Sequence, residues 1–253
     1  MKPNYDLLWL LDKYDNGETL KFIFFWGHTN KSPDVVNKAC FSQWYESSFI
    51  VNGILYPTTE HWMMAHKALL FNNRAIFEKI IQVPKPSEVK RLGRMVTGFN
   101  QQIWDTKKRE IVKIGNIHKF NQHPKLADFL LSTEKRILVE ASPVDNIWGI
   151  GLSQDNDTIE NIYTWQGENL LGFILMEVRD FLKDFGHFQY LTHPMLPPWE
   201  KFPQVTSQDL FWRMGNGETY LGIFNDYFMK LSIRDQIIYK LSYPQPFGWG
   251  EFY

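Results

Sequence analysis

Glu60 and Lys67 are the residues whose types and spacing could do chemistry in this chain. They lie in the segment Tyr56–Ala68, where Pro57 suits a position just outside a helix and Thr58 is a good N-cap. Two helical turns separate them, so the carboxylate and the amine share nearly one face, about 10 Å apart along the axis. A small substrate could sit between the two groups. The alternative is a solvated glutamate and a solvated lysine on a helix surface.

The remaining pattern predicts the elements that must position this pair. A buried apolar run over 20–26 indicates a strand, and Asn52-Gly53 predicts a hairpin turn joining residues 44–50 to 51–56. After the hairpin the chain reads as mostly helical, with one further strand. We expect helices at 59–70, 72–82, 88–95 (capped by Ser87), 100–120, 126–131 and 170–183, a strand at 138–141 and a polar loop at 142–166.

Length and composition bound the class of protein. The 253 residues suit one large domain or one domain with an appendage, and the net charge of −1 argues against a nucleic-acid binder held by bulk charge. Cys40 is the single cysteine, which excludes an intramolecular disulfide and fits a reducing, cytoplasmic setting. We expect Cys40 to be a core residue. The acidic N-terminal stretch does not resemble a signal peptide, and no apolar run approaches the ~20 residues of a membrane helix.

The charges are segregated along the chain. Residues 85–120 hold nine Lys and Arg against three Asp and Glu, whereas residues 121–180 hold four against ten. Two readings stay open. The two segments could pack side by side and neutralise each other, or the first could form a basic wall for phosphates. The candidates for that wall are Lys90, Arg91, Arg94, Lys107, Lys108 and Arg109.

Residues 187–253 differ from the rest of the chain. They carry 16 aromatic residues in 67 positions, too many for a disordered tail, and prolines divide them into short pieces. We therefore expect a domain over 1–186 and, over 187–253, an aromatic-rich extension docked on it. Ordinary packing is the favoured role for these rings, and a stacking platform for a base or single-stranded nucleic acid is the alternative.

Metal and cofactor motifs are missing from the sequence. His61 and His66 are five apart, as are His118 and His123, which places each pair on different helix faces. No HExxH motif, cysteine pair, GxGxxG motif or P-loop lysine is present. We expect a protein without a metal or a cofactor.

Several segments, in order over residues 22–182, resemble the NADAR family, also called the YbiA-like proteins. The opening strand, the "SNF"-like segment, the "SEH…K" helix, the central helices, the "WGxG" loop and the final "GxNxLGxxLMEvR" helix all have counterparts. In the same order these are Phe24–Gly27, Cys40–Trp44, Glu60–Lys67, Arg91–Arg94 with Trp104, Asp145–Gly151, and Gly167–Gly172 with Leu175–Arg179.

This resemblance implies an α+β, helix-dominated, YbiA-like domain with a small N-terminal antiparallel sheet. It also implies an N-glycosidase that cleaves riboflavin-pathway ribosylamines or removes ADP-ribose from guanine bases. By the matched motifs, the catalytic residues are Glu60, Lys67 and Asp145. The substrate-binding residues would be Trp26, Gln43, Trp44, Arg94, Trp148, Gly149 and Asn169.

The glycosidase chemistry makes physical demands on these groups. Breaking a C1′–N bond builds positive charge on the sugar, which a carboxylate stabilises, and the leaving base needs a proton. The positive end of its helix should lower the pKa of Glu60, which favours a stabilising anion over a general acid unless the pocket is dry. Lys67 could form a Schiff base with the open sugar if its amine is neutral, or could clamp a phosphate.

The other matched residues have competing roles. Trp148 and Trp44 could stack on a base or simply pack, and Trp104 suits the core. Asn169 could contact the substrate or cap the helix that follows it. The glycines at 149 and 151 could let the backbone approach a ligand.

The sequence therefore predicts metal-free hydrolysis of an N-ribosidic bond, with a phosphorylated ribosyl or ADP-ribosyl substrate. The favoured reaction is removal of ADP-ribose from a modified guanine in nucleic acid such as ADP-ribosylated DNA. The alternatives are an N-glycosidase of phosphorylated ribosylamine intermediates of riboflavin biosynthesis and a non-catalytic ADP-ribose-binding module.

Overall fold

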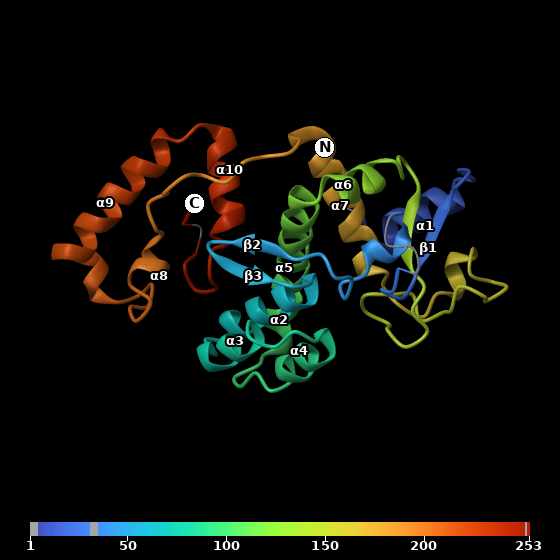
Figure 1. Cartoon of the computed structure of the whole chain (residues 1–253), viewed down its shortest axis with the longest axis horizontal. Coiled ribbons are helices and arrows are strands. Elements are labelled where there is room, and N and C mark those ends of the chain that lie inside the picture. Colours follow the sequence, from blue (N-terminus) through green and yellow to red (C-terminus); the bar gives the residue numbers. More distant parts are fainter. Residues whose placement is uncertain (1–4, 31–34, 251) are drawn as a thin grey trace. The chain divides into compact units, whose positions relative to one another are not determined.

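The computed structural model describes residues 5–30, 35–250 and 252–253. The chain divides into two compact units, Met1–His187 and Phe188–Tyr253 (Figure 1). This boundary lies one residue beyond the predicted one. The docking of the extension on the first unit stays a prediction.

The first unit is mainly helical, with two small sheets. Its elements are α1 (Leu7–Asp15), β1 (Phe22–Phe25), η1 (Lys38–Phe41), β2 (Phe49–Val51), β3 (Ile54–Tyr56), α2 (Thr59–Leu70), α3 (Arg74–Ile80), α4 (Pro86–Gly93), α5 (Gln101–Gln122), α6 (Pro124–Leu131), β4 (Ile137–Glu140), η2 (Ile162–Thr164) and α7 (Leu170–Phe185). The helix-dominated α+β class is confirmed. The cap of α4 is not Ser87, because Pro86 takes the first helical position and Lys85 precedes it.

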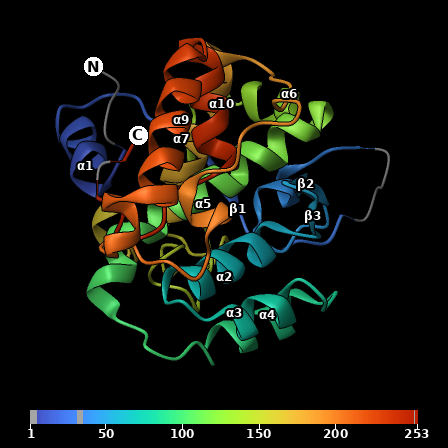
Figure 2. The same cartoon turned by 90° about the vertical axis from the view of Figure 1, so that its left-hand side faces the viewer.

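Helix α2 is central to the first unit. The Thr58 side chain caps it by accepting a hydrogen bond from the His61 amide, and most of its residues are buried. It packs against α3, α4 and α5, and both views show α2, α3 and α4 together (Figure 1, Figure 2). A Cβ at Gly115 would lie 2.4 Å from the Trp62 ring, so α5 approaches α2 closely only with glycine there. The Trp62 indole then donates to the Ile111 carbonyl at 2.8 Å.

The two sheets have two strands each. Strands β2 and β3 form the predicted antiparallel hairpin, with Asn52 and Gly53 both at positive φ. Strands β1 and β4 pair in parallel, with Phe25 opposite Glu140. Helix α7 packs on β4, and a Cβ at Gly172 would lie 2.0 Å from the Leu138 carbonyl oxygen. This contact fixes how closely the helix carries its N-terminus to the sheet.

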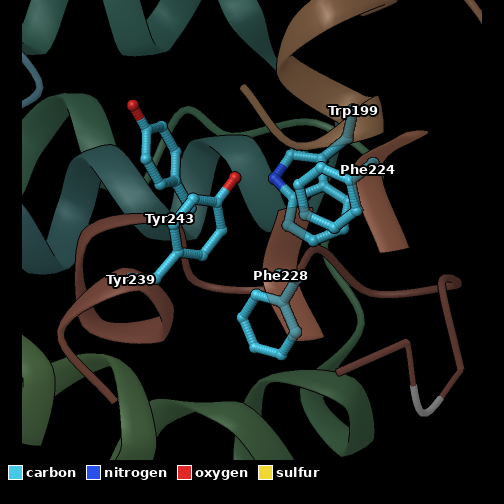
Figure 3. Close-up of a cluster of buried hydrophobic side chains, with 5 residues drawn as sticks. All are labelled: Trp199, Phe224, Phe228, Tyr239 and Tyr243. Carbon is cyan, nitrogen blue, oxygen red and sulfur yellow. The ribbon is translucent and has the colours of Figure 1, made fainter. Parts of the chain in front are cut away.

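The second unit has its own aromatic core. Its elements are α8 (Pro198–Lys201), η3 (Leu210–Arg213), α9 (Gly215–Lys230) and α10 (Ile233–Ser242). The buried cluster comprises Trp199, Phe224, Phe228, Tyr239 and Tyr243 (Figure 3). The prolines break only the two ends of this segment, since none lies between Pro203 and Pro244, where the 16-residue α9 and the 10-residue α10 form.

Candidate functional site

Glu60 lies in the first turn of α2 and is only 3% exposed. Its amide donates to the Gln43 carbonyl at 2.9 Å, which seats the helix N-terminus on the preceding segment. Burial raises the pKa of Glu60 to about 7, and Lys90, a Trp44 hydrogen bond and Lys67 oppose that rise. Loss of hydration therefore outweighs the helix dipole, so the expected lowering of this pKa does not hold and the dry-pocket exception applies.

One oxygen of Glu60 is free for a ligand. Its Oε1 is buried and has no hydrogen-bond partner among the described residues. An unpaired buried carboxylate oxygen is costly, since it has lost its water without a replacement donor. Such an atom is typical of a site where the substrate supplies the missing contact.

Two further carboxylates face Glu60, and with it they form the carboxylate cluster: Glu60, Glu140 and Asp145. The charge of Asp145 adds to the rise in the pKa of Glu60. Burial raises the pKa of Glu140 to about 8, and Asp145 and Glu60 raise it further while Lys90 opposes them. The predicted pair Glu60 and Asp145 is thus close enough to interact. Glu140 was missed, although a carboxylate ending the apolar run Ile137–Val139 was a usable signal.

Asp145 also shapes the loop in which it lies. Its Oδ1 accepts hydrogen bonds from the amides of Ile147 at 3.0 Å and Trp148 at 2.9 Å. These bonds close a tight turn over residues 145–148, and the half-buried Trp148 is the last residue of that turn. Asp145 therefore has a positioning role within its loop in addition to its charge.

Lys67 lies in the last part of α2, half-buried beside two aromatic rings. Its Nζ is 4.3 Å from the ring centroid of Phe99 and 5.5 Å from that of Trp104. Burial lowers the pKa of Lys67, Glu60 opposes this, and the charge of Arg94 adds to it. Arg94 is exposed at the C-terminus of α4 and lies close enough to Lys67 for their charges to interact.

Trp44 and Lys90 also interact with Glu60. Trp44 is half-buried, its side chain hydrogen-bonds Glu60, and the Lys90 ammonium is 6.0 Å from its ring centroid. The His28 ring stands 5.6 Å from Trp44. Lys90 was expected only as part of a basic wall, but it is coupled to both Glu60 and Glu140.

The segment that carries Gln43 and Trp44 is held from beneath by a buried lysine. The Lys119 ammonium is fully buried and donates to the carbonyls of Cys40 at 2.6 Å and Ser42 at 3.2 Å. The Gln43 side chain is also buried and donates to Asn116 at 3.4 Å. Its backbone carbonyl, which receives the Glu60 amide, thus ties α2 to this segment.

The glycines of the 145–151 loop serve close packing within the chain. A Cβ at Gly149 would lie 2.7 Å from the Glu140 carbonyl, and one at Gly151 would lie 2.7 Å from the Asn146 side chain. Asn169 is fully buried in a left-handed conformation and does not cap α7 with its side chain. Instead, the side-chain amide of Asn169 hydrogen-bonds to β4. It donates to the Leu138 carbonyl at 2.9 Å and accepts from the Glu140 backbone amide at 3.0 Å.

Trp26 follows β1 directly and is 52% exposed. Its neighbour Phe25 pairs with Glu140 and accepts a hydrogen bond from the Ala141 amide at 2.9 Å. Trp26 therefore leaves the sheet at the edge where Glu140 ends β4. The proposed contacts of Trp26, Gln43, Trp44, Arg94, Trp148, Gly149 and Asn169 with a substrate stay predictions, as do the three catalytic assignments.

A cavity of about 450 Å³ lies elsewhere in the first unit. None of its lining residues belongs to the carboxylate cluster. They are Tyr14, Glu18, Leu20, Phe22, Asp157, Thr158, Glu160 and Asn161. The acidic lining disfavours a phosphate there, because like charges repel.

Over the described part of the chain, no group of three or more His, Cys, Asp and Glu side chains is arranged to hold a metal ion. Within the same residues, the helices are too short or too polar for any of them to span a bilayer.

Comparisons with known proteins place these features in a family. The NADAR domain profile matches residues 24–183. The chain is 45% identical over 168 residues to N-glycosidase R617 of Acanthamoeba polyphaga mimivirus, covering 64% of this chain and 97% of that protein. It is 30% identical over 145 residues to N-glycosidase Npun_R5314 of Nostoc punctiforme, covering 57% of this chain and 86% of the relative. The NMR structure of the E. coli protein YbiA aligns with a TM-score of 0.53 and 26% identity, over 68% of this chain and 92% of that one.

Proposed function

The chain belongs to the NADAR family, and from that premise we propose that it is an N-glycosidase that hydrolyses the bond between a ribose carbon and a base nitrogen. The observation that carries this proposal is Glu60, a buried carboxylate whose Oε1 lacks a partner within the described residues. Lys67 and Lys90 both interact with it. Such a carboxylate can lie beneath the anomeric carbon and stabilise the positive charge that develops there.

Surrounding groups fit a phosphorylated sugar attached to a flat base. Lys67 and Lys90 supply cations beside Glu60, Arg94 lies near Lys67, and phosphate oxygens accept hydrogen bonds from such groups. Trp44, partly buried, and Trp26, half-exposed, offer ring faces for stacking. Cations and rings around one carboxylate favour a substrate with both phosphate and base.

Lys67 has two possible roles within this proposal. Burial lowers the pKa of its amine, which favours the neutral form that attacks a sugar aldehyde. Glu60 and the two nearby rings favour the ammonium, which would clamp a phosphate. We take the clamp as the working assignment and the imine as its competitor.

For the substrate, we propose ADP-ribose attached to a guanine base of nucleic acid. Lys67 and Lys90 beside Glu60, together with Arg94 near Lys67, suit a diphosphate better than a single phosphate. We place the reaction in the cytoplasm, because the one cysteine, Cys40, is a buried free thiol. A phosphorylated ribosylamine of riboflavin biosynthesis is the competing substrate.

The test compares the two substrates directly. The full chain is incubated with ADP-ribosylated DNA and, separately, with the riboflavin-pathway ribosylamine phosphate, and released sugar and base are quantified by mass spectrometry. We expect ADP-ribose and intact guanine from the DNA. Release only from the ribosylamine would favour the other substrate, and binding of ADP-ribose without release from either would identify a binding module.

A further inference from the structure

Glu140 is the member of the carboxylate cluster that the family motifs did not assign. Its backbone is fixed on both sides, because its amide donates to the Asn169 side chain at 3.0 Å and its carbonyl accepts from the Ile150 amide at 2.9 Å. Strand pairing with Phe25 adds a third constraint. The chain thus holds this carboxyl group in one place at the end of β4.

The Glu140 side chain has an orphaned atom. Its Oε2 is buried without a hydrogen-bond partner in the described part of the chain. Glu60 Oε1 is in the same condition, so two neighbouring carboxyl groups each have an unpaired buried oxygen. A single structural glutamate of this kind would be a cost to stability, whereas two interacting carboxyl groups match the pair that glycoside cleavage requires.

The partners of the three carboxylates differ. Glu60 accepts a hydrogen bond from the Trp44 side chain and interacts with the cations Lys90 and Lys67. Asp145 accepts hydrogen bonds from two backbone amides of its own loop. Among the described residues, Glu140 interacts with Asp145 from the following loop, with Glu60 from α2 and with the cation Lys90 from α4. Two like charges add to the raised pKa of Glu140, whereas Lys90 and Lys67 both favour the anion of Glu60, so a proton is more stable on Glu140 than on Glu60.

We propose that Glu140 is the general acid that protonates the departing base, while Glu60 is the carboxylate beneath the anomeric carbon. This inference rests on the proposed N-glycosidase function. Burial raises the pKa of both carboxyl groups, to about 8 for Glu140 and to about 7 for Glu60, and Lys67 opposes the rise at Glu60. Two carboxyl groups whose environments separate their pKa values divide into an acid and a base.

The step balances without any co-reactant other than water. The C1′–N bond breaks with its electron pair on the base nitrogen, and that nitrogen takes the proton of Glu140. A water oxygen bonds to C1′ and loses one proton to the Glu60 carboxylate. Solvent exchange then moves a proton from Glu60 back to Glu140, so one water is consumed per bond.

The experiment uses substrates that differ in their need for an acid. The full-length wild type, Glu140→Gln and Glu60→Gln are assayed on the N-ribosylated substrate and on a 4-nitrophenyl riboside phosphate, whose phenolate leaves without a proton. Glu78→Gln, an exposed change on α3, is the control. We expect Glu140→Gln to slow the first substrate by about 10²–10⁴ and the second by less than about tenfold. Glu60→Gln should slow both.

Equal slowing of both substrates by Glu140→Gln, or no slowing of either, would overturn the assignment. Thermal unfolding of each variant shows whether a loss is due to misfolding, and Glu140→Asp, which keeps a carboxyl group, should restore part of the rate on the first substrate. A folded Glu140→Asp no faster than Glu140→Gln would also count against an acid. If wild type releases no sugar from any N-ribosylated substrate, the proposed function itself fails, which is a different result.

Discussion

Replacing Glu60 with glutamine is expected to stabilise the protein at alkaline pH. Glu60 is almost fully buried, and burial raises its pKa from 4.5 to about 7. The folded state therefore binds this proton more tightly than the unfolded state. The stability that the protonated group supplies is fully present below pH 4.5 and is lost as the pH rises through about 7.

The size of the effect follows from the shift. Each pKa unit corresponds to about 1.4 kcal/mol, so the change from 4.5 to about 7 gives an upper limit of about 3 kcal/mol above pH 7. For a unit of this size, that is about 6 to 12 °C in the melting temperature. Glutamine stays neutral at every pH, keeps an oxygen for the Trp44 indole, and so escapes this loss.

Thermal unfolding of ligand-free wild type and Glu60→Gln at pH 5 and pH 8.5 checks this reasoning. The variant should gain stability relative to wild type between the two conditions. Glu78→Gln, on the exposed side of α3, controls for removal of one carboxylate and should show no such gain. A difference between Glu60→Gln and wild type that is the same at both pH values would refute the claim that Glu60 is buried at a cost.

Three further predictions concern other parts of the chain. Borohydride should trap the sugar on wild type but not on Lys67→Arg if the imine forms; an active Lys67→Arg with no trapped adduct leaves the clamp. Gly172→Ala should cost about 1–3 kcal/mol in the free energy of unfolding, because its Cβ would lie 2.0 Å from a β4 carbonyl oxygen. Gly222→Ala, with no described atom within 4 Å of its Cβ, should instead gain about 0.5–1 kcal/mol, and equal effects would contradict this. Truncation after Gly186 should lower the melting temperature or cause aggregation if the extension docks; an equally stable, fully active fragment would show that docking does not support the fold.

Local signals predicted the element that carries the site. The range Thr59–Leu70 was predicted for α2, because a capping threonine follows a proline there, and the hairpin was predicted from Asn52-Gly53. Both features depend on residues adjacent in sequence. The sequence also held a signal for α9 and α10, because both helices lie in the proline-free run between Pro203 and Pro244.

The remaining features depend on contacts between distant segments. The parallel pairing of β1 with β4 joins residues more than 100 positions apart, and neither strand pattern specifies its partner. The pKa of Glu60 is raised where the helix dipole alone predicts a lower value, because the dipole is a property of its own helix whereas burial comes from the rest of the fold. The buried Lys119 was missed for the same reason, since its surroundings exist only after folding, whereas Glu140 had a local signal at the end of an apolar run.

Turnover by Glu60→Gln tests the central claim most directly. Single-turnover release of sugar from the N-ribosylated substrate is measured for wild type and the variant at saturating enzyme, with substrate affinity measured in parallel. Loss of one positioned electrostatic group costs about 10²–10³ in rate, so the variant should bind with near wild-type affinity and cleave that much more slowly. A folded Glu60→Gln protein that releases sugar at the wild-type rate would contradict the account.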